Sequence, residues 1–204
     1  MRKPLTRERV FAAAMAIADA EGVGALTMRR LGTELGVEAM SLYHHVRNKE
    51  ALLDGVVETL IGEILAAVRD TGEGEWRACL RGWFLAARSV MLRHRWGPGL
   101  LNAREAVPFG VFEYYDAILR VMVRAGFSYR IAHRALHAFG SLPLGFSQET
   151  FTGGDPGPRV MELPHLMAMV ASESHGAELG WCDSRVEFEF TVDLMLDGLN
   201  RTYL

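Results

Sequence analysis

The apolar residues of this chain recur at intervals of three and four, which is the spacing of helices that each bury one face. The first such stretch begins after Thr6, a suitable N-terminal cap, and ends at about Glu21, ahead of two glycines. Its apolar face is formed by Val10, Phe11, Ala14, Ile17 and Ala18. No segment of any length alternates apolar and polar residues as a strand does, so we expect an all-α protein.

Residues 27–69 show a second pattern, of two short helices followed by a long one. Thr27 is expected to cap a helix that ends at Gly36, and a short helix spans about Glu38 to His45. Asn48 is expected to cap a long helix that runs to about Arg69. Two short helices joined by a glycine turn are the layout of a helix-turn-helix, which predicts double-stranded DNA as a partner.

The remaining chain is predicted to add a set of longer helices. Helical spacing covers residues 75–95, 99–105, 108–125, 128–146, 165–178 and 185–201, with a bend near Pro143 and a loop at 152–164. We therefore expect two domains: a three-helix helix-turn-helix DNA-binding domain at 1–49, joined by a long helix to a helical ligand-binding and dimerisation domain at 50–204.

Charge distinguishes the two predicted domains. Residues 1–49 carry eight Lys/Arg and five Asp/Glu, whereas the rest carries 14 and 20, within a net charge of −3. A basic N-terminal domain followed by an acidic domain suits a protein that contacts phosphate through its N-terminal domain only. The two cysteines form no framework, and neither an export signal nor an apolar run of membrane-spanning length is present. We expect a cytoplasmic protein without a membrane partner.

The candidate DNA contacts follow from the geometry of a recognition helix, whose N-terminal end enters the major groove. Ala39, Met40 and Ser41 are expected at base edges, and Tyr43, His44 and His45 one turn further on, at phosphates or an adjacent base. Thr27 and Lys49 lie at helix starts, where exposed N–H groups favour phosphate, so they are also candidate DNA contacts. Arg29, on the second helix, is a further candidate for guanine or phosphate. The alternative is that these are only polar residues on a small helical domain.

The same stretch resembles the tetracycline-repressor (TetR) family of one-component regulators. The resemblance covers residues 5 to about 60 and rests on Leu26-Thr27, Arg29-Arg30-Leu31, Leu35-Gly36-Val37, Leu42-Tyr43, His45-Val46, Asn48-Lys49 and Leu52-Leu53. A looser resemblance to the tetracycline-repressor-like ligand domains rests on Trp76 with Leu80, Arg93-His94-Arg95-Trp96, Ala125-Gly126-Phe127-Ser128 and Phe188-Glu189-Phe190 with Asp193 and Leu196-Asp197-Gly198-Leu199. The front of the recognition helix departs from the tetracycline-responsive members, which have Gln-Pro-Thr where this chain has Ala39-Met40-Ser41.

The resemblance implies a homodimer that pairs through the last long helices, here 128–146 and 185–201. Two apolar stripes on these helices are candidates for that pairing: Phe188, Val192, Met195, Leu196 and Leu199 on one, and Ala132, Ala135, Phe139 and Leu142 on the other. The alternative is that both stripes face their own core. A dimer is also favoured because one short recognition helix contacts too few bases, whereas two heads suit a palindromic operator.

The resemblance also implies a small-molecule effector that binds between the helices of the second domain. Candidate contacts are Trp83, Met91, Phe112, Tyr115, His133, His137 and Phe139, although most such side chains belong to ordinary cores. His133 and His137 have the i, i+4 spacing of metal ligands, but no carboxylate or cysteine joins them at a suitable spacing on that helix. A polar contact or a hydrogen-bonded core histidine is favoured, and no metal or cofactor is expected.

The sequence thus predicts a ligand-responsive repressor that is released from operator DNA by a mostly apolar effector. One alternative is a constitutive regulator or activator whose second domain only dimerises. A third is an enzyme with an incidental helix-turn-helix, which the absence of nucleophile, phosphate-loop and metalloprotease motifs disfavours.

Overall fold

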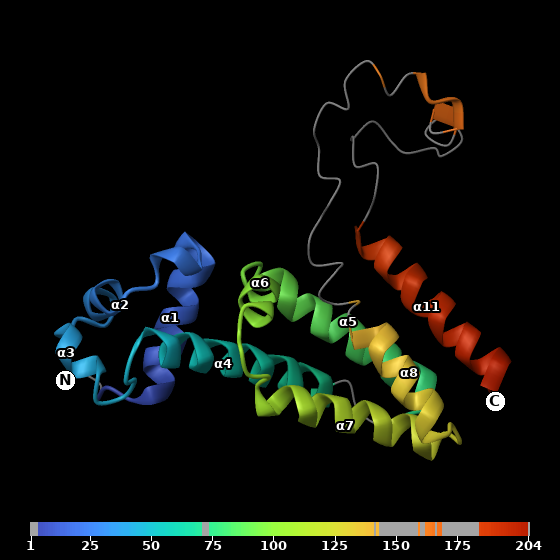
Figure 1. Ribbon diagram of the computed structural model, residues 1–204, viewed down its shortest axis with the longest axis horizontal. Helices are drawn as coiled ribbons and strands as arrows, with labels where there is room; N and C mark the ends of the chain where they lie inside the picture. The colour runs from blue at the N-terminus through green and yellow to red at the C-terminus, as the bar shows by residue number, and fades with distance from the viewer. Residues whose placement is uncertain are drawn as a thin grey trace.

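The computed structural model describes residues 4–70, 74–140, 142, 159, 162–165, 167–168 and 184–203, and this part of the chain is helical, without strands. None of its helices combines the length and the apolar character needed to cross a bilayer. The elements (Figure 1) are α1 Arg7–Glu21, the 3-10 turn η1 Val23–Ala25, α2 Met28–Leu35, α3 Ala39–Leu42, α4 Lys49–Asp70, α5 Trp76–Arg93, α6 Gly97–Asn102, α7 Phe109–Arg124, α8 Tyr129–Gly140 and α11 Ser184–Tyr203.

The predicted caps of the first helices are confirmed. The Thr6 hydroxyl accepts a hydrogen bond from Arg9 N at 3.3 Å, and the Thr27 hydroxyl accepts one from Arg30 N at 3.0 Å. Asn48 Oδ1 accepts from Ala51 N at 2.8 Å at the start of α4. Gly36 ends α2 in the left-handed region, with φ of 65°, which disfavours any side chain.

Several helix boundaries differ from the predicted ones. α3 ends at Leu42 rather than at His45, because the chain tightens there into turns in which His45 N donates to Leu42 O at 2.9 Å. α6 begins at Gly97 rather than at residue 99, since a proline fits the first turn of a helix. α11 begins at Ser184 rather than at residue 185 and ends at Tyr203 rather than at residue 201. The bend near Pro143 and most of the predicted loop 152–164 and helix 165–178 lie outside the described residues.

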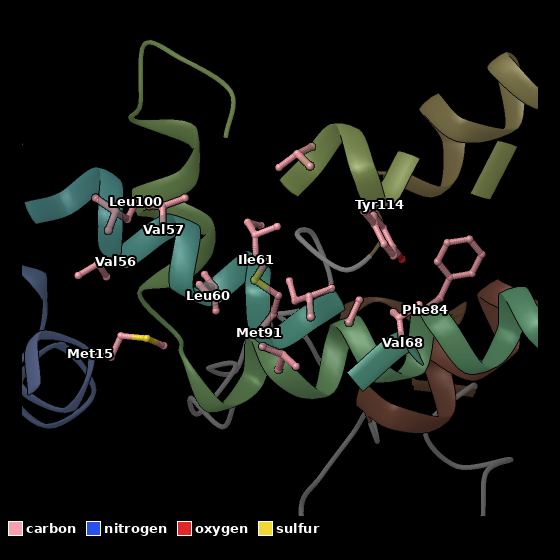
Figure 2. Close-up of a cluster of buried hydrophobic side chains, with 14 of the residues drawn as sticks. Met15, Val56, Val57, Leu60, Ile61, Val68, Phe84, Met91, Leu100 and Tyr114 are labelled. Carbon is pink, nitrogen blue, oxygen red and sulfur yellow. The ribbon is translucent and has the colours of Figure 1, made fainter. Parts of the chain in front are cut away.

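The long helix α4 connects the head, α1–α3, to the body, α5–α11. It packs on α1 at one end and on α5, α6 and α7 along the rest of its length. In Figure 2, Val56 and Leu60 of α4 lie on the side of Met15, and Val68 lies near Phe84 and Tyr114. One continuous apolar core therefore runs from the head into the body.

Helix α11 is fixed to α5 by its buried face and by ion pairs. Arg81 reaches Glu189 at 2.8 Å and Asp193 at 2.9 Å, and Arg77 reaches Asp197 at 2.6 Å. Hydrogen bonds to Asp193, and then to Glu189, raise the pKa of the Arg81 guanidinium. These contacts hold α11 against α5 in the body (Figure 1).

The predicted dimer stripes are largely buried within their own chain. Phe188, Val192 and Leu196 of α11 are fully buried, and so are Ala132, Ala135 and Phe139 of α8, at 4% exposed or less. The alternative interpretation, that these residues face their own core, is therefore correct for them. The large apolar residues that α11 exposes lie two positions away from these buried residues: Val186, Phe190 and Leu194 are 52%, 63% and 55% exposed.

Candidate functional site

The turn from α2 into α3 presents the front of α3 to solvent. Leu42 and Val46 are buried, at 0% and 3% exposed, and fix the short helix to the head. On its other side Met40 is 73% exposed and Tyr43 42% exposed, while Ala39 and Ser41 are half-buried. A short helix held by apolar anchors on one side and exposed on the other is the geometry of a groove-entering element.

A close approach of two backbones sets the position of α3 relative to α2. A Cβ added at Gly32 would lie 2.8 Å from the carbonyl oxygen of Val37 and 3.3 Å from the amide nitrogen of Ala39. Both neighbours are backbone atoms, so a side chain at this position would push α3 away from α2. The glycine of α2 therefore determines how closely the two helices pack.

The two adjacent arginines of α2 have different surroundings. Arg30 is paired with Glu21 at 2.6 Å and with Glu34 at 2.8 Å. Hydrogen bonds to Glu21, and then to Glu34, raise the pKa of Arg30 above its usual value. Arg29 is exposed, and no ion pair involves its side chain in the described part of the chain. Arg29 is consequently available to phosphate or a base, whereas the guanidinium of Arg30 is engaged in its two ion pairs.

The remaining predicted DNA contacts lie around the same surface. Thr27, His44 and Lys49 are exposed and His45 is half-buried, although the Thr27 hydroxyl also serves as the cap of α2. Arg47 is exposed between α3 and α4, and our sequence reasoning overlooked it. The sequence did indicate it, because Arg47 is a cation directly before the Asn48 cap, and the start of a helix favours phosphate.

A polar cluster connects the head to the body. His94, at the end of α5, is 7% exposed and lies between two carboxylates. Its Nδ1 is 2.8 Å from Asp19 Oδ1 of α1, and its Nε2 is 3.1 Å from Glu63 Oε2 of α4. Trp96 Nε1 also donates to Asp19 Oδ1, at 2.6 Å. A displacement at the α5–α6 junction would therefore be transmitted directly to α1 and α4.

Arg104 forms a second connection, just after α6. It pairs with Glu50 at 2.7 Å and with Asp54 at 2.9 Å, both on the first turns of α4. The hydrogen bond to Glu50 raises the pKa of Arg104. The segment around α6 thus contacts the end of α4 that carries the head.

Two cavities lie along the α4–α5–α7 side of the body. The larger has a volume of about 570 Å³ and is half-open to solvent. It is lined by Leu65, Val68, Arg69, Gly74, Trp76, Cys79, Trp83, Glu113, Ala117, Arg120, Val121, Arg124 and Ala125. The smaller, of about 60 Å³, lies nearer α6 and is lined by Ile61, Ile64, Ala87, Met91, Leu101, Val111, Tyr114, Tyr115 and Gly140. The volume of the larger is that of a drug-sized ligand site.

Three of the predicted effector contacts line these cavities: Trp83 lines the larger, and Met91 and Tyr115 line the smaller. Phe139 lines neither and is buried against Phe84, with ring centroids 4.6 Å apart. Tyr114 was not among the predicted contacts. Tyr114 lines the smaller cavity. Its ring is buried, and its hydroxyl has no hydrogen-bond partner among the described residues. Burial raises the pKa of this hydroxyl.

The other predicted effector contacts, Phe112, His133 and His137, line neither cavity, and their role in effector binding stays a prediction. Phe112 is 53% exposed on α7 and lines neither cavity. His133 and His137 lie on the exposed face of α8, with their Nε2 atoms 3.0 Å apart, because the opposite face carries the buried residues of that helix. No group of three or more metal-ligating side chains forms within the described ranges.

The comparisons with known proteins agree with this arrangement. Residues 10–56 match the family model described as "Bacterial regulatory proteins, tetR family", and residues 69–203 match the "Tetracyclin repressor-like, C-terminal domain". The tetracycline repressor protein class A from transposon 1721 of Escherichia coli is 31% identical over 200 residues, which cover 96% of this chain and 90% of that protein.

Solved structures show the same likeness over nearly the full length. A "possible TetR family transcriptional regulator" from Streptomyces coelicolor A3(2) superimposes with a TM-score of 0.75 at 28% identity, covering 96% of this chain and 98% of that one. TetR from Acinetobacter baumannii AYE gives a TM-score of 0.70 at 27% identity, covering 97% and 98%. With both family models matched in chain order and the helix-turn-helix geometry present, this chain belongs to the tetR family of DNA-binding transcriptional regulators and is not an enzyme.

Proposed function

We propose that this regulator is a repressor that binds a palindromic operator as a homodimer and is released by a small, mostly apolar effector. The observation that carries the DNA-binding part is the exposed front of α3 on its buried Leu42 anchor. Met40 and Ala39 suit the methyl group of thymine, and Ser41 suits a hydrogen bond at a base edge. Arg29, Arg47 and Lys49 surround them with positive charge.

Phosphate and base contacts divide among the other candidates. Thr27, Tyr43, His44 and His45 lie around the same surface and are placed to position the head on the DNA backbone. Contacts of this kind set affinity for any duplex, whereas the α3 residues set which sequence is preferred.

The proposed dimer uses the exposed faces of α8 and α11. Val186, Phe190 and Leu194 are spaced by four residues, so they form one apolar stripe along α11. The similarity to a tetracycline repressor protein supports the repressor part of the proposal. A two-fold dimer places two copies of α3 on adjacent major grooves, about 34–36 Å apart. Such a protein acts in the cytoplasm, where it meets DNA.

The proposed release depends on the connection between the body cavities and the head. Helices α4, α5 and α7 line both cavities, and α4 carries the head at its other end. A ligand that separates these helices displaces His94 and Arg104 relative to Asp19 and Glu50. Such linkage between two sites typically amounts to about 1–3 kcal/mol, or about 5- to 150-fold in DNA affinity.

A gel-shift titration of the Phe190→Asp variant tests the DNA-binding proposal. A buried aspartate in an apolar dimer interface is costly, so we expect a monomeric chain that loses operator binding but keeps its helix content. Asn200→Asp, on an exposed position near the end of α11, is the control that adds the same charge. A monomeric Phe190→Asp variant that binds operator as tightly as the original would contradict the proposal.

A further inference from the structure

The larger cavity contains more positive charge than the body around it would suggest. Residues 50–204 carry a net negative charge, yet the described lining of this cavity holds three exposed arginines, Arg69, Arg120 and Arg124, and one carboxylate, Glu113. Arg69 and Arg124 form no ion pair in the described part of the chain, and Arg120 has only a 3.5 Å contact to the exposed Asp116. The charge of the cavity is therefore not neutralised by its own lining.

The apolar wall of the same cavity contributes an unused hydrogen-bond donor. Trp76 and Trp83 supply flat aromatic surfaces, and the Nε1–H of Trp83 is buried without a partner among the described residues. An indole nitrogen donates and does not accept. A buried donor without a partner is unfavourable, so it favours a ligand atom that accepts.

We infer that the effector of this regulator is a planar aromatic anion, such as an aromatic carboxylate. Its ring packs on Trp76 and Trp83, its negative group faces Arg69, Arg120 and Arg124, and an acceptor oxygen takes the Trp83 N–H. Guanidinium groups pair with a carboxylate through two parallel hydrogen bonds, which gives direction as well as attraction. This inference rests on the proposed ligand-responsive function and specifies its ligand.

Three probes of one shape and different charge separate this class from others. They are 2-naphthoate, neutral 2-naphthamide and cationic 2-naphthylmethylammonium, titrated into the full-length dimer by calorimetry at neutral pH. We expect 2-naphthoate to bind most tightly and the cation most weakly. Raising salt from about 0.1 M to about 1 M shortens the screening length from about 10 Å to about 3 Å, so the preference for the anion should shrink.

Substitutions assign the charge preference to the cavity. Arg120→Gln and Arg124→Gln are each expected to weaken 2-naphthoate about twofold to fivefold, which is the effect of one partly exposed ion pair. They should leave 2-naphthamide within about twofold, since it carries no charge. Arg130→Gln, on the exposed face of α8 and outside the cavity, is the matched control and should change neither.

Trp83→Phe tests the donor, because it keeps an aromatic wall and removes the N–H. We expect about tenfold weaker binding of 2-naphthoate together with a higher unfolding midpoint of the ligand-free protein, since an unpartnered donor is lost. Unchanged 2-naphthoate affinity in this variant would overturn the role of the indole. A fall in both affinity and midpoint would also overturn it, because that result is expected from a packing defect.

Release from operator DNA, measured by gel shift with the same probes, separates this inference from the proposed function. Release by 2-naphthoate alone supports both. Release by the neutral or cationic probe in preference to the anion overturns the anionic class and leaves the ligand-responsive function in place. If none of the three probes binds, the cavity is not a site for planar aromatics and the inference fails, while operator binding still stands on its own test.

Discussion

The contact between α2 and α3 predicts different effects on stability for two glycine-to-alanine substitutions. Gly32 and Gly62 both lie inside helices, so alanine should gain about 1 kcal/mol of helix propensity at either position. At Gly62 the added Cβ meets nothing within 4 Å, whereas at Gly32 it meets backbone atoms of Val37 and Ala39. Overpacking against backbone that cannot yield costs about 1–3 kcal/mol. Gly62→Ala should be stabilising, and Gly32→Ala should be less stable than it by about 1–3 kcal/mol.

Urea denaturation of both variants at one fixed protein concentration measures this difference, because the proposed dimer makes stability depend on protein concentration. The same displacement of α3 should reduce operator affinity for Gly32→Ala by about tenfold or more in a gel shift, as expected for about 1.4 kcal/mol. Gly62→Ala should bind normally. Equal stabilisation and equal DNA binding by the two variants would refute the argument that Gly32 sets the position of α3.

Three further predictions concern other parts of the molecule. Tyr114→Phe removes a buried hydroxyl without a partner and should raise the free energy of unfolding by about 1–2 kcal/mol, measured by urea denaturation; a loss of stability would show that the hydroxyl is satisfied. Arg29→Ala should weaken binding to operator and unrelated DNA alike in gel shifts, whereas Arg30→Ala should leave DNA affinity nearly unchanged because its charge is already paired; equal effects would contradict the distinction. His94→Leu removes the imidazole that Asp19 and Glu63 share and should lower the free energy of unfolding by about 1–3 kcal/mol. Unchanged stability would show that the cluster does not join head and body.

Local signals in the sequence predicted the elements of the head well. Thr6, Thr27 and Asn48 are caps whose partners lie three residues away, so their roles depend only on nearby chain. The positive φ of Gly36 is likewise a local property of a helix end. Because α3 is only one turn long, its end at Leu42 was beyond what apolar periodicity can define.

Tertiary partners were much less predictable. An apolar stripe with helical spacing defines a buried face, but it does not say whether the same chain or a partner covers it. For this reason Phe188 and Val192 were candidates for a dimer interface as well as for the core, and they face their own core. His94 is 75 residues from Asp19, so its contact with the head had no local signal. Tyr114 was overlooked because periodicity places a residue on a buried face without showing whether its hydroxyl finds a partner.

The central claim is that two copies of α3, related by a two-fold axis, contact base edges in DNA. The most direct test is repeated selection from random duplexes with the full-length protein, followed by sequencing of the bound DNA. We expect an enriched palindrome whose half-site centres are about 10 base pairs, or a multiple of one helical turn, apart, with a shifted consensus for the Ser41→Ala protein. Enrichment of no sequence, or of sites without two-fold symmetry, would contradict the account.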